Sequence, residues 1–156
     1  MLFRSVSGER LTMVILDTVS GVSLTRVSDM GCTNVPAGYG CLRVANMSYA
    51  GSSYDVRTFN NQTAFAGVGY KEVTSYKQTS SGTYTFFVTG SQYAVSALGE
   101  LPVLVLSSIV GVSCPTCTVS NPLLTFNVND RAGRAYTCYI IRNPWSGLFR
   151  VYVLED

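Results

Sequence analysis

The feature that most constrains the fold of this chain is a series of short segments in which apolar and polar side chains alternate. The alternation is clearest in Thr83–Phe86 and in Phe149–Val153. A period of two residues is typical of a β-strand with one buried face, because successive side chains point to opposite faces of a sheet. The best candidate for a helix, Gln92–Gly99, would form only about two turns. We therefore expect an all-β chain.

Ten segments are expected to form strands. They are Leu11–Leu16, Val22–Val27, Cys41–Asn46, Tyr54–Phe59, Thr63–Val68, Thr83–Thr89, Leu101–Val110, Leu123–Val128, Arg134–Arg142 and Leu148–Leu154. Short strands separated by turn-forming residues predict an antiparallel sandwich of two sheets. The alternation then places six side chains in the core: Tyr84, Phe86, Tyr136, Ile140, Val151 and Val153.

Composition supports this fold class. Apolar residues make up 47% of the 156 residues and charged residues 13%, against about 25% charged in average proteins. The length suits one domain, with a short appendage. Residues 28–40 are expected to form a linker or a disulfide-tied loop. They separate an N-terminal strand extension, residues 1–40, from a β-sandwich domain, residues 41–156.

Charge and hydropathy argue against two classes of partner. The net charge is +2 and the arginines are scattered along the chain, so no basic cluster exists to follow a phosphate backbone and nucleic acid is not an expected partner. No run of 18 apolar residues is present, so no membrane span is expected. The N-terminal segment does not have the pattern of a clear signal peptide.

The five cysteines suggest an oxidising compartment. Cys32 and Cys41 bracket a loop rich in Gly and Pro, and Cys114 and Cys117 stand in the sequence CPTC. We expect two local disulfides, Cys32–Cys41 and Cys114–Cys117. A redox-active CxxC and a zinc site of four thiolates are the alternatives. Cys138 is expected to be a buried free thiol, with a disulfide between subunits as the alternative.

The chain lacks the residues of common catalytic sites. It contains no histidine, which excludes catalytic triads with histidine and most catalytic zinc sites. Its nine carboxylates are spread thinly. We therefore expect no enzymatic activity, no cofactor and no metal. One alternative for a metal is the pattern Asn127-x-Asn129-Asp130, which could offer oxygen ligands to calcium. Asn46 and Asn61 stand in sequons and are candidate glycosylation sites.

The body of the chain resembles a known family over roughly residues 41–156. The similar segments follow the family's order: Leu42–Asn46 with Tyr54–Val56, Val68–Tyr76, Ser81–Thr85, Ala132–Thr137 and Val153–Asp156. The family is the bacterial cell-surface and secreted domain of unknown function 4397. The sequence departs from it in Val112–Asn121, which carries the CPTC pair, and in Asn46-Met47-Ser48, where the family often has His-Ala-Ser. The resemblance implies an immunoglobulin-like sandwich outside the cell, and it implies no reaction.

The two ends of the chain share a pattern. Residues 3–5 and 11–17 align without gaps with residues 141–143 and 149–155. Chance similarity between two strands is one explanation, and excision from a tandem array of domains is another. The interpretation we favour is that the N-terminal strand is added to the sheet edge of a neighbouring copy. The predicted contact residues are Leu11, Met13, Val14, Ile15 and Leu16.

The expected function is therefore that of a structural subunit of an extracellular filament or cell-surface array. The partner is the chain itself, because a head-to-tail strand exchange extends into an open polymer. The alternative is a cell-surface binding module for a glycan or protein partner. Its contacts would be loop aromatics, which anchor sugars and partners. These are Tyr39, Tyr49, Tyr93 and Trp145. A viral coat or tail subunit is a third alternative.

Overall fold

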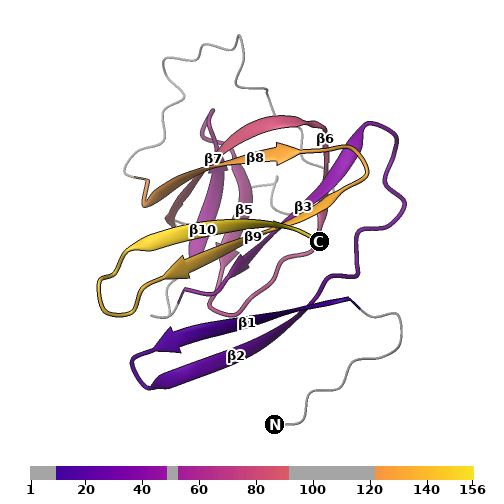
Figure 1. Cartoon of the computed structure of the whole chain (residues 1–156). Coiled ribbons are helices and arrows are strands. Elements are labelled where there is room, and N and C mark those ends of the chain that lie inside the picture. The colour runs from indigo at the N-terminus through magenta and orange to yellow at the C-terminus, as the bar shows by residue number, and fades with distance from the viewer. Residues whose placement is uncertain (1–9, 49–52, 92–121) are drawn as a thin grey trace.

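The computed structural model describes residues 10–48, 53–91 and 122–156, and these residues form β-strands in three layers (Figure 1). The all-β fold class is thus confirmed, as an immunoglobulin-like sandwich with an added hairpin. The expected strand Leu101–Val110, the helix candidate Gln92–Gly99 and the pair Cys114 and Cys117 lie outside the described residues. Within the three described ranges, no helix has the length and hydrophobicity that a membrane span requires.

Three sheets are formed. The first is a hairpin of β1 (Leu11–Thr18) and β2 (Gly21–Ser28). The second has the order β10 (Phe149–Glu155), β9 (Ala135–Arg142), β3 (Tyr39–Asn46) and β6 (Lys77–Ser80). The third has the order β5 (Thr63–Val68), β4 (Tyr54–Thr58), β7 (Gly82–Gly90) and β8 (Leu124–Asp130).

Two features of the sheets differ from the sequence-based expectation. β3 and β9 pair in parallel, from Cys41 opposite Ala135 to Asn46 opposite Ile140, so the second sheet is mixed and the sandwich is not fully antiparallel. β6 was not predicted, because its sequence KQTS is polar and only four residues long. It pairs with the start of β3.

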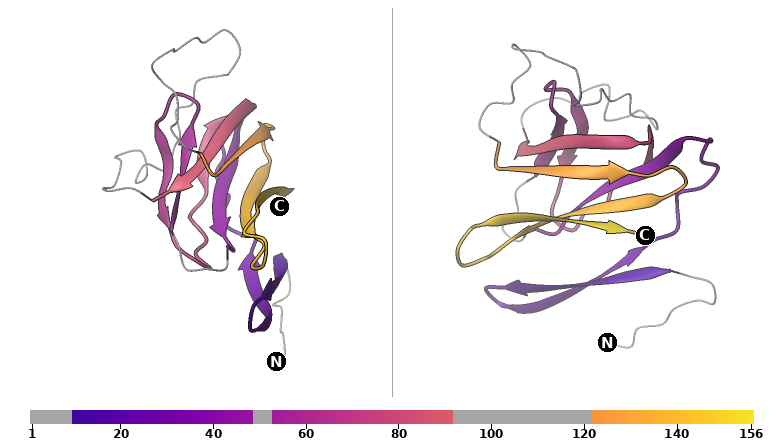
Figure 2. Two further views of the ribbon diagram at one scale, coloured as in Figure 1. Left: turned by 90° about the vertical axis from the view of Figure 1, so that its left-hand side faces the viewer. Right: turned by 45° about the horizontal axis from the view of Figure 1, so that its top comes forward.

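The second and third sheets pack face to face and enclose the main core (Figure 2). The predicted core residues are confirmed. Tyr84, Phe86, Tyr136 and Ile140 are buried in this core, and Val151 and Val153 are half-buried against it. Alternation alone was therefore enough to assign the inner faces of β7, β9 and β10.

The hairpin forms the third layer. Val14, Leu16 and Val27 pack against Ala45 and Tyr139, on the outer faces of β3 and β9, and against Met47, which follows β3. All but one of the β3 residues are consequently buried. The N-terminal strands thus cover part of the sandwich, instead of extending away from it.

Two predictions on the cysteines are confirmed. Cys32 and Cys41 form a disulfide, with their Cα atoms 6.1 Å apart, which ties the segment after the hairpin to β3. Cys138 is a free, fully buried thiol of the main core. Burial raises the pKa of this thiol far above its ordinary value, so Cys138 behaves as a small apolar residue.

Candidate interaction surface

Most of the exposed apolar side chains of the described residues belong to two neighbouring parts of the molecule, the β1–β2 hairpin and β10 with the loop before it. Nine of the eleven large hydrophobic residues that are exposed there lie in the β1–β2 hairpin, in β10 or in the β9–β10 loop. They are Met13, Ile15, Val19, Val22, Leu24, Trp145, Leu148, Tyr152 and Leu154. We call this set the apolar side. A concentration of this kind is typical of an interaction surface, because scattered exposure is the norm elsewhere.

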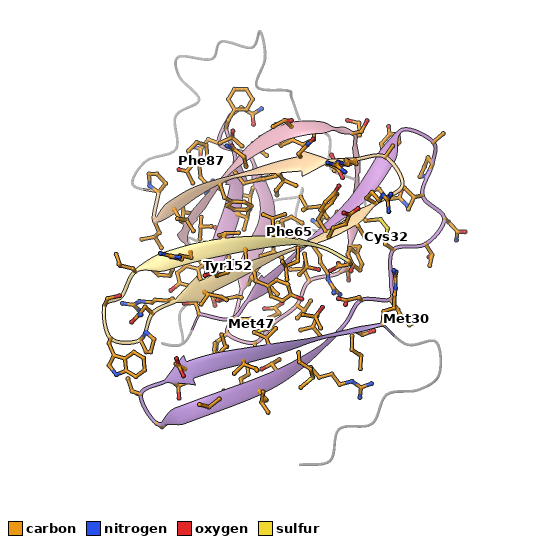
Figure 3. The ribbon with its side chains drawn as sticks, in the orientation of Figure 1. Met30, Cys32, Met47, Phe65, Phe87 and Tyr152 are labelled. Carbon is orange, nitrogen blue, oxygen red and sulfur yellow. A yellow bond between two sulfur atoms is a disulfide. The ribbon has the colours of Figure 1, made fainter. Side chains whose placement is uncertain are left out.

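A groove of about 500 Å³ runs through the apolar side. Ile15, Leu16 and Asp17 of β1 line it on one side, and residues of β9, β10 and their loop line it on the other. Tyr152 lies on the outer face of β10, and Met47 lies between this strand and the hairpin (Figure 3). The groove exists because the hairpin covers β3 and β9 but leaves the outer face of β10 open.

The loop at the end of the groove is held in one conformation. Asn143 Oδ1 accepts hydrogen bonds from the backbone N–H groups of Trp145 and Ser146, both at 2.9 Å. The backbone of Asn143 is also bonded to Leu148 and to Gly147. Gly147 has a φ of 74°, which favours glycine. Trp145 is 68% exposed, so the loop presents an aromatic ring to solvent. Because hydrogen bonds already hold the loop backbone, binding a partner would cost little backbone entropy.

The hairpin exposes only part of the predicted contact strand. Met13 and Ile15 point to solvent, and Ile15 stands opposite Leu24 of β2 in the ladder. Val14 and Leu16 are buried against the chain's own body, and Leu11 is half-buried. β1 pairs with β2 along all of its eight residues. The five predicted residues therefore divide between an internal contact and the apolar side.

Two strand edges border the apolar side. In the sheet orders of the described residues, β1 has β2 as its one neighbour and β10 has β9 as its one neighbour. The other edge of each strand carries N–H and C=O groups that are not used in a described ladder. Such edges can accept another strand.

A buried group of polar side chains fastens the hairpin to the body. Arg43 of β3 forms an ion pair with Asp29, which follows β2, at 3.1 Å. Its Nε donates a hydrogen bond to Thr137 Oγ1 at 2.8 Å. Thr12 of β1 donates to the second carboxylate oxygen of Asp29 at 2.7 Å. Both charged side chains are more than nine-tenths buried, so each depends on the other for its stability.

Asp156 and Tyr76 complete this group, which we call the polar cluster. Thr137 Oγ1 donates to Asp156 at 2.6 Å, and the Tyr76 hydroxyl donates to the same carboxylate oxygen. The Arg43 guanidinium lies 4.3 Å from the centre of the Tyr76 ring and 3.9 Å from Asp156. Burial raises the pKa of Asp156, and burial together with the hydrogen bond to Asp156 raises the pKa of Tyr76.

The polar cluster was not predicted from the sequence, although a signal for it was present. Arg43, Tyr76, Thr137 and Asp156 each belong to a different one of the segments that resemble the family. Those segments are far apart in the chain and meet at this one place. The signal in the sequence was that each of these four segments contains a charged residue or a residue with a hydroxyl group.

The two sequons lie in different environments. The Asn46 side chain is fully buried, donates to the carbonyl of Val68 at 2.9 Å and accepts from the Ser48 N–H at 2.9 Å. A glycan on the fully buried Asn46 has no space in this fold, which argues against this candidate. Asn61 is exposed in a turn. Of the candidate aromatics, Tyr39 is half-buried, and Tyr49 and Tyr93 lie outside the described residues.

Comparison with known proteins gives one family. Residues 40–108 match the model of a domain of unknown function, DUF4397. No curated protein matches the chain. The match covers β3 to β7 and agrees with the immunoglobulin-like arrangement of these strands. Over this stretch the chain is similar to the DUF4397 family.

Proposed function

We propose that the chain is a structural subunit outside the cell, which assembles with further copies of itself through the apolar side. The observation that carries this proposal is the concentration of exposed aliphatic and aromatic side chains on the hairpin and on β10. Covering them with a second copy would remove apolar surface from water, which is the main favourable term in association.

Two unused strand edges on the same side favour a copy of the chain as the partner. Pairing of β1 in one copy with β10 in the next joins two different surfaces. Such a heterologous contact repeats into an open filament or array. It also satisfies the edge N–H and C=O groups of both strands.

Edge pairing breaks fewer existing contacts than exchange of the N-terminal strand. Exchange would remove Val14 and Leu16 from Met47 and Tyr139, and Thr12 from Asp29. Edge pairing leaves these contacts in place. We therefore propose that β1 stays in its own hairpin and accepts a neighbour's strand along its second edge.

The disulfide Cys32–Cys41 supports a location outside the cell. Disulfides form and persist in oxidising compartments and are rare in the cytosol. A subunit on the cell surface or in a secreted assembly would meet this condition.

The proposal can be tested with Ile15→Lys and Leu24→Lys, separately and together. Lysine on an exposed strand opposes pairing. We expect wild type to form large oligomers or filaments in size-exclusion chromatography with light scattering and in negative-stain microscopy, and the double variant to remain monomeric. Met30→Lys and Leu123→Lys are matched controls, because both residues are exposed but lie off the apolar side. A wild type that stays monomeric at high concentration, or a double variant that assembles normally, would contradict the proposal.

A binding module for a glycan is the second candidate function. Trp145 is presented on a fixed loop beside a groove that also contains Asp17 and Arg150, and aromatic rings with nearby planar polar groups suit sugars. Trp145 is the one tryptophan of the chain, so its fluorescence reports binding directly. A glycan that shifts this emission, and that Trp145→Ala fails to bind, would favour this candidate. If the chain binds no glycan on an array, this candidate function is wrong.

A further inference from the structure

Asp130 is a buried carboxylate without a partner. It ends β8, faces the opposite sheet and is 2% exposed. Neither of its carboxylate oxygens has a hydrogen-bond partner, and it forms no ion pair with a described residue. Burial raises its pKa to about 7. An ionised carboxylate in such a place is costly unless something compensates its charge.

Carbonyl oxygens converge on the same place, next to Gly40 of β3. A Cβ atom built on Gly40 would lie 2.2 Å from Asp130 Oδ1, 2.7 Å from the Arg131 carbonyl oxygen and 3.0 Å from the Arg134 carbonyl oxygen. Three oxygens thus surround one point. The Arg134 oxygen accepts a hydrogen bond from the Cys41 N–H at 2.8 Å, and the Arg131 oxygen accepts one from the Arg134 N–H at 3.2 Å. The Asp130 carboxylate accepts none, and its charge beside two carbonyl dipoles is unfavourable unless a cation or a proton lies between them.

A fourth oxygen belongs to the same region. Thr79 of β6 stands directly opposite Gly40 in the antiparallel ladder. Opposite residues in such a ladder project to the same face, so Thr79 points to the side of Gly40 where Asp130 lies. Thr79 is fully buried, and its hydroxyl has no hydrogen-bond partner. Two unpartnered polar side chains from facing sheets therefore lie on the inner side of the sandwich next to Gly40.

This group of oxygen atoms differs from the calcium ligands that the sequence pattern Asn127-x-Asn129-Asp130 suggested. Asn127 and Asn129 are exposed on the other face of β8, and Asn127 accepts a hydrogen bond from Thr85 at 2.7 Å. Only Asp130 of that pattern faces inward. Alternation along β8 separates the three residues, and the fold supplies Thr79 and two carbonyl groups instead.

We propose that Asp130, Thr79 and the carbonyl groups of Arg131 and Arg134 bind a hard cation of the calcium type. Ca²⁺ is held by carboxylate, carbonyl and hydroxyl oxygens at about 2.3–2.6 Å and tolerates irregular geometry. The Asp130, Arg131 and Arg134 oxygens lie within 3.0 Å of a common point, so small shifts give these distances for three ligands, with the ion displaced away from the Gly40 Cα and towards Thr79. The turn 131–134 beside the site is exposed, so water would complete the coordination from this side.

The cationic side chains near this place in the described part of the chain contact other groups. Lys77, on the same face as Thr79, donates to the carbonyl of Ala64 at 3.0 Å and lies over the Phe65 ring. Arg131 and Arg134 are exposed, and Arg134 pairs with Glu155 at 3.3 Å. The bound cation would connect the β8–β9 turn to β3 and β6, and so close this end of the sandwich.

The test is thermal unfolding and calorimetric titration of the full chain after treatment with a chelator, at about pH 8. With CaCl₂ at about a hundred times the dissociation constant, we expect the Tm of wild type to rise by at least about 5 °C. MgCl₂ should act more weakly because Mg²⁺ demands near-octahedral geometry, and NaCl of equal ionic strength should have little effect. Asp130→Asn should abolish the rise, and Thr79→Val should reduce it.

Two further measurements separate a binding role from a structural one. Without cation, Asp130→Asn should be at least as stable as wild type, because it removes an uncompensated charge. The exposed Asp17→Asn variant is the matched control and should respond to calcium as wild type does. The proposal is wrong if wild type shows no response to calcium, or if Asp130→Asn responds equally. It is also wrong if only acidification towards pH 5 stabilises wild type, which would mean that a proton occupies this position.

Discussion

The sheet β10–β9–β3–β6 has two faces that are covered in different ways. Its inner face packs against the third sheet through apolar side chains such as Leu42, Cys138 and Ile140, all at most 1% exposed. Its outer face is covered by the hairpin over β3 and β9 only. There the apolar contact is small, and the polar cluster around Arg43 adds ionic bonds.

This difference indicates two levels of stability. The inner contact is extensive, and burial of apolar area is sufficient to stabilise it. The outer contact depends on buried charges that stabilise only as a complete set. We therefore expect that the hairpin can be detached while the sandwich remains folded, whereas damage to the inner core unfolds the whole domain. The predictions below test this comparison.

The largest effect is expected in the inner core. Phe86→Ala should lower the free energy of unfolding by about 3–5 kcal/mol, because Phe86 is 1% exposed and its ring stacks on Phe126 at 5.5 Å. Phe87→Ala is the matched control, since Phe87 is half-buried on the opposite face of β7 and should cost clearly less. Urea unfolding measures both. Equal losses would show that the two faces of β7 contribute alike.

A smaller and local effect is expected from Arg43→Met. The change leaves Asp29 and Asp156 buried without their cation, at a cost of about 3 kcal/mol. Hydrogen exchange should show lost protection in β1 and β2, while β7 and β8 keep theirs. Arg134→Met is the control, because its ion pair with Glu155 is largely exposed and pairs of this kind contribute about 0–1 kcal/mol. Uniform loss of protection in the Arg43 variant would show that hairpin and sandwich unfold together.

The inner core was predictable from the sequence because alternation is a local property. Phe86 and Tyr84 lie two residues apart on one strand, and no knowledge of the partner sheet is needed to place them on the same face. The disulfide Cys32–Cys41 was predictable for a similar reason, since nine positions separate its cysteines along a loop. Both predictions depend only on residues that are close together in the sequence.

The outer contact was not predictable because its determinants are far apart. Arg43 and Thr137 are separated by 94 positions, and Tyr76 and Asp156 by 80. Period-two patterns give no information on which strands are neighbours, so the parallel pairing of β3 with β9 also stayed hidden. In β1 the outward residues Met13 and Ile15 are as apolar as the inward Val14 and Leu16. The buried face of that strand could therefore not be chosen.

The smallest effects are expected from two neighbouring residues of β1, which lie on opposite faces of the hairpin. Val14→Thr buries a hydroxyl against Met47 and Tyr139 and should lower the free energy of unfolding by about 1–2 kcal/mol. Ile15→Thr changes a side chain that is 69% exposed and should alter stability by less than about 0.5 kcal/mol. Ile15→Thr should nevertheless weaken self-association in sedimentation velocity, because Ile15 belongs to the apolar side, whereas Val14→Thr should not. Stability losses in the reverse order would mean that the hairpin rests on the body by its other face.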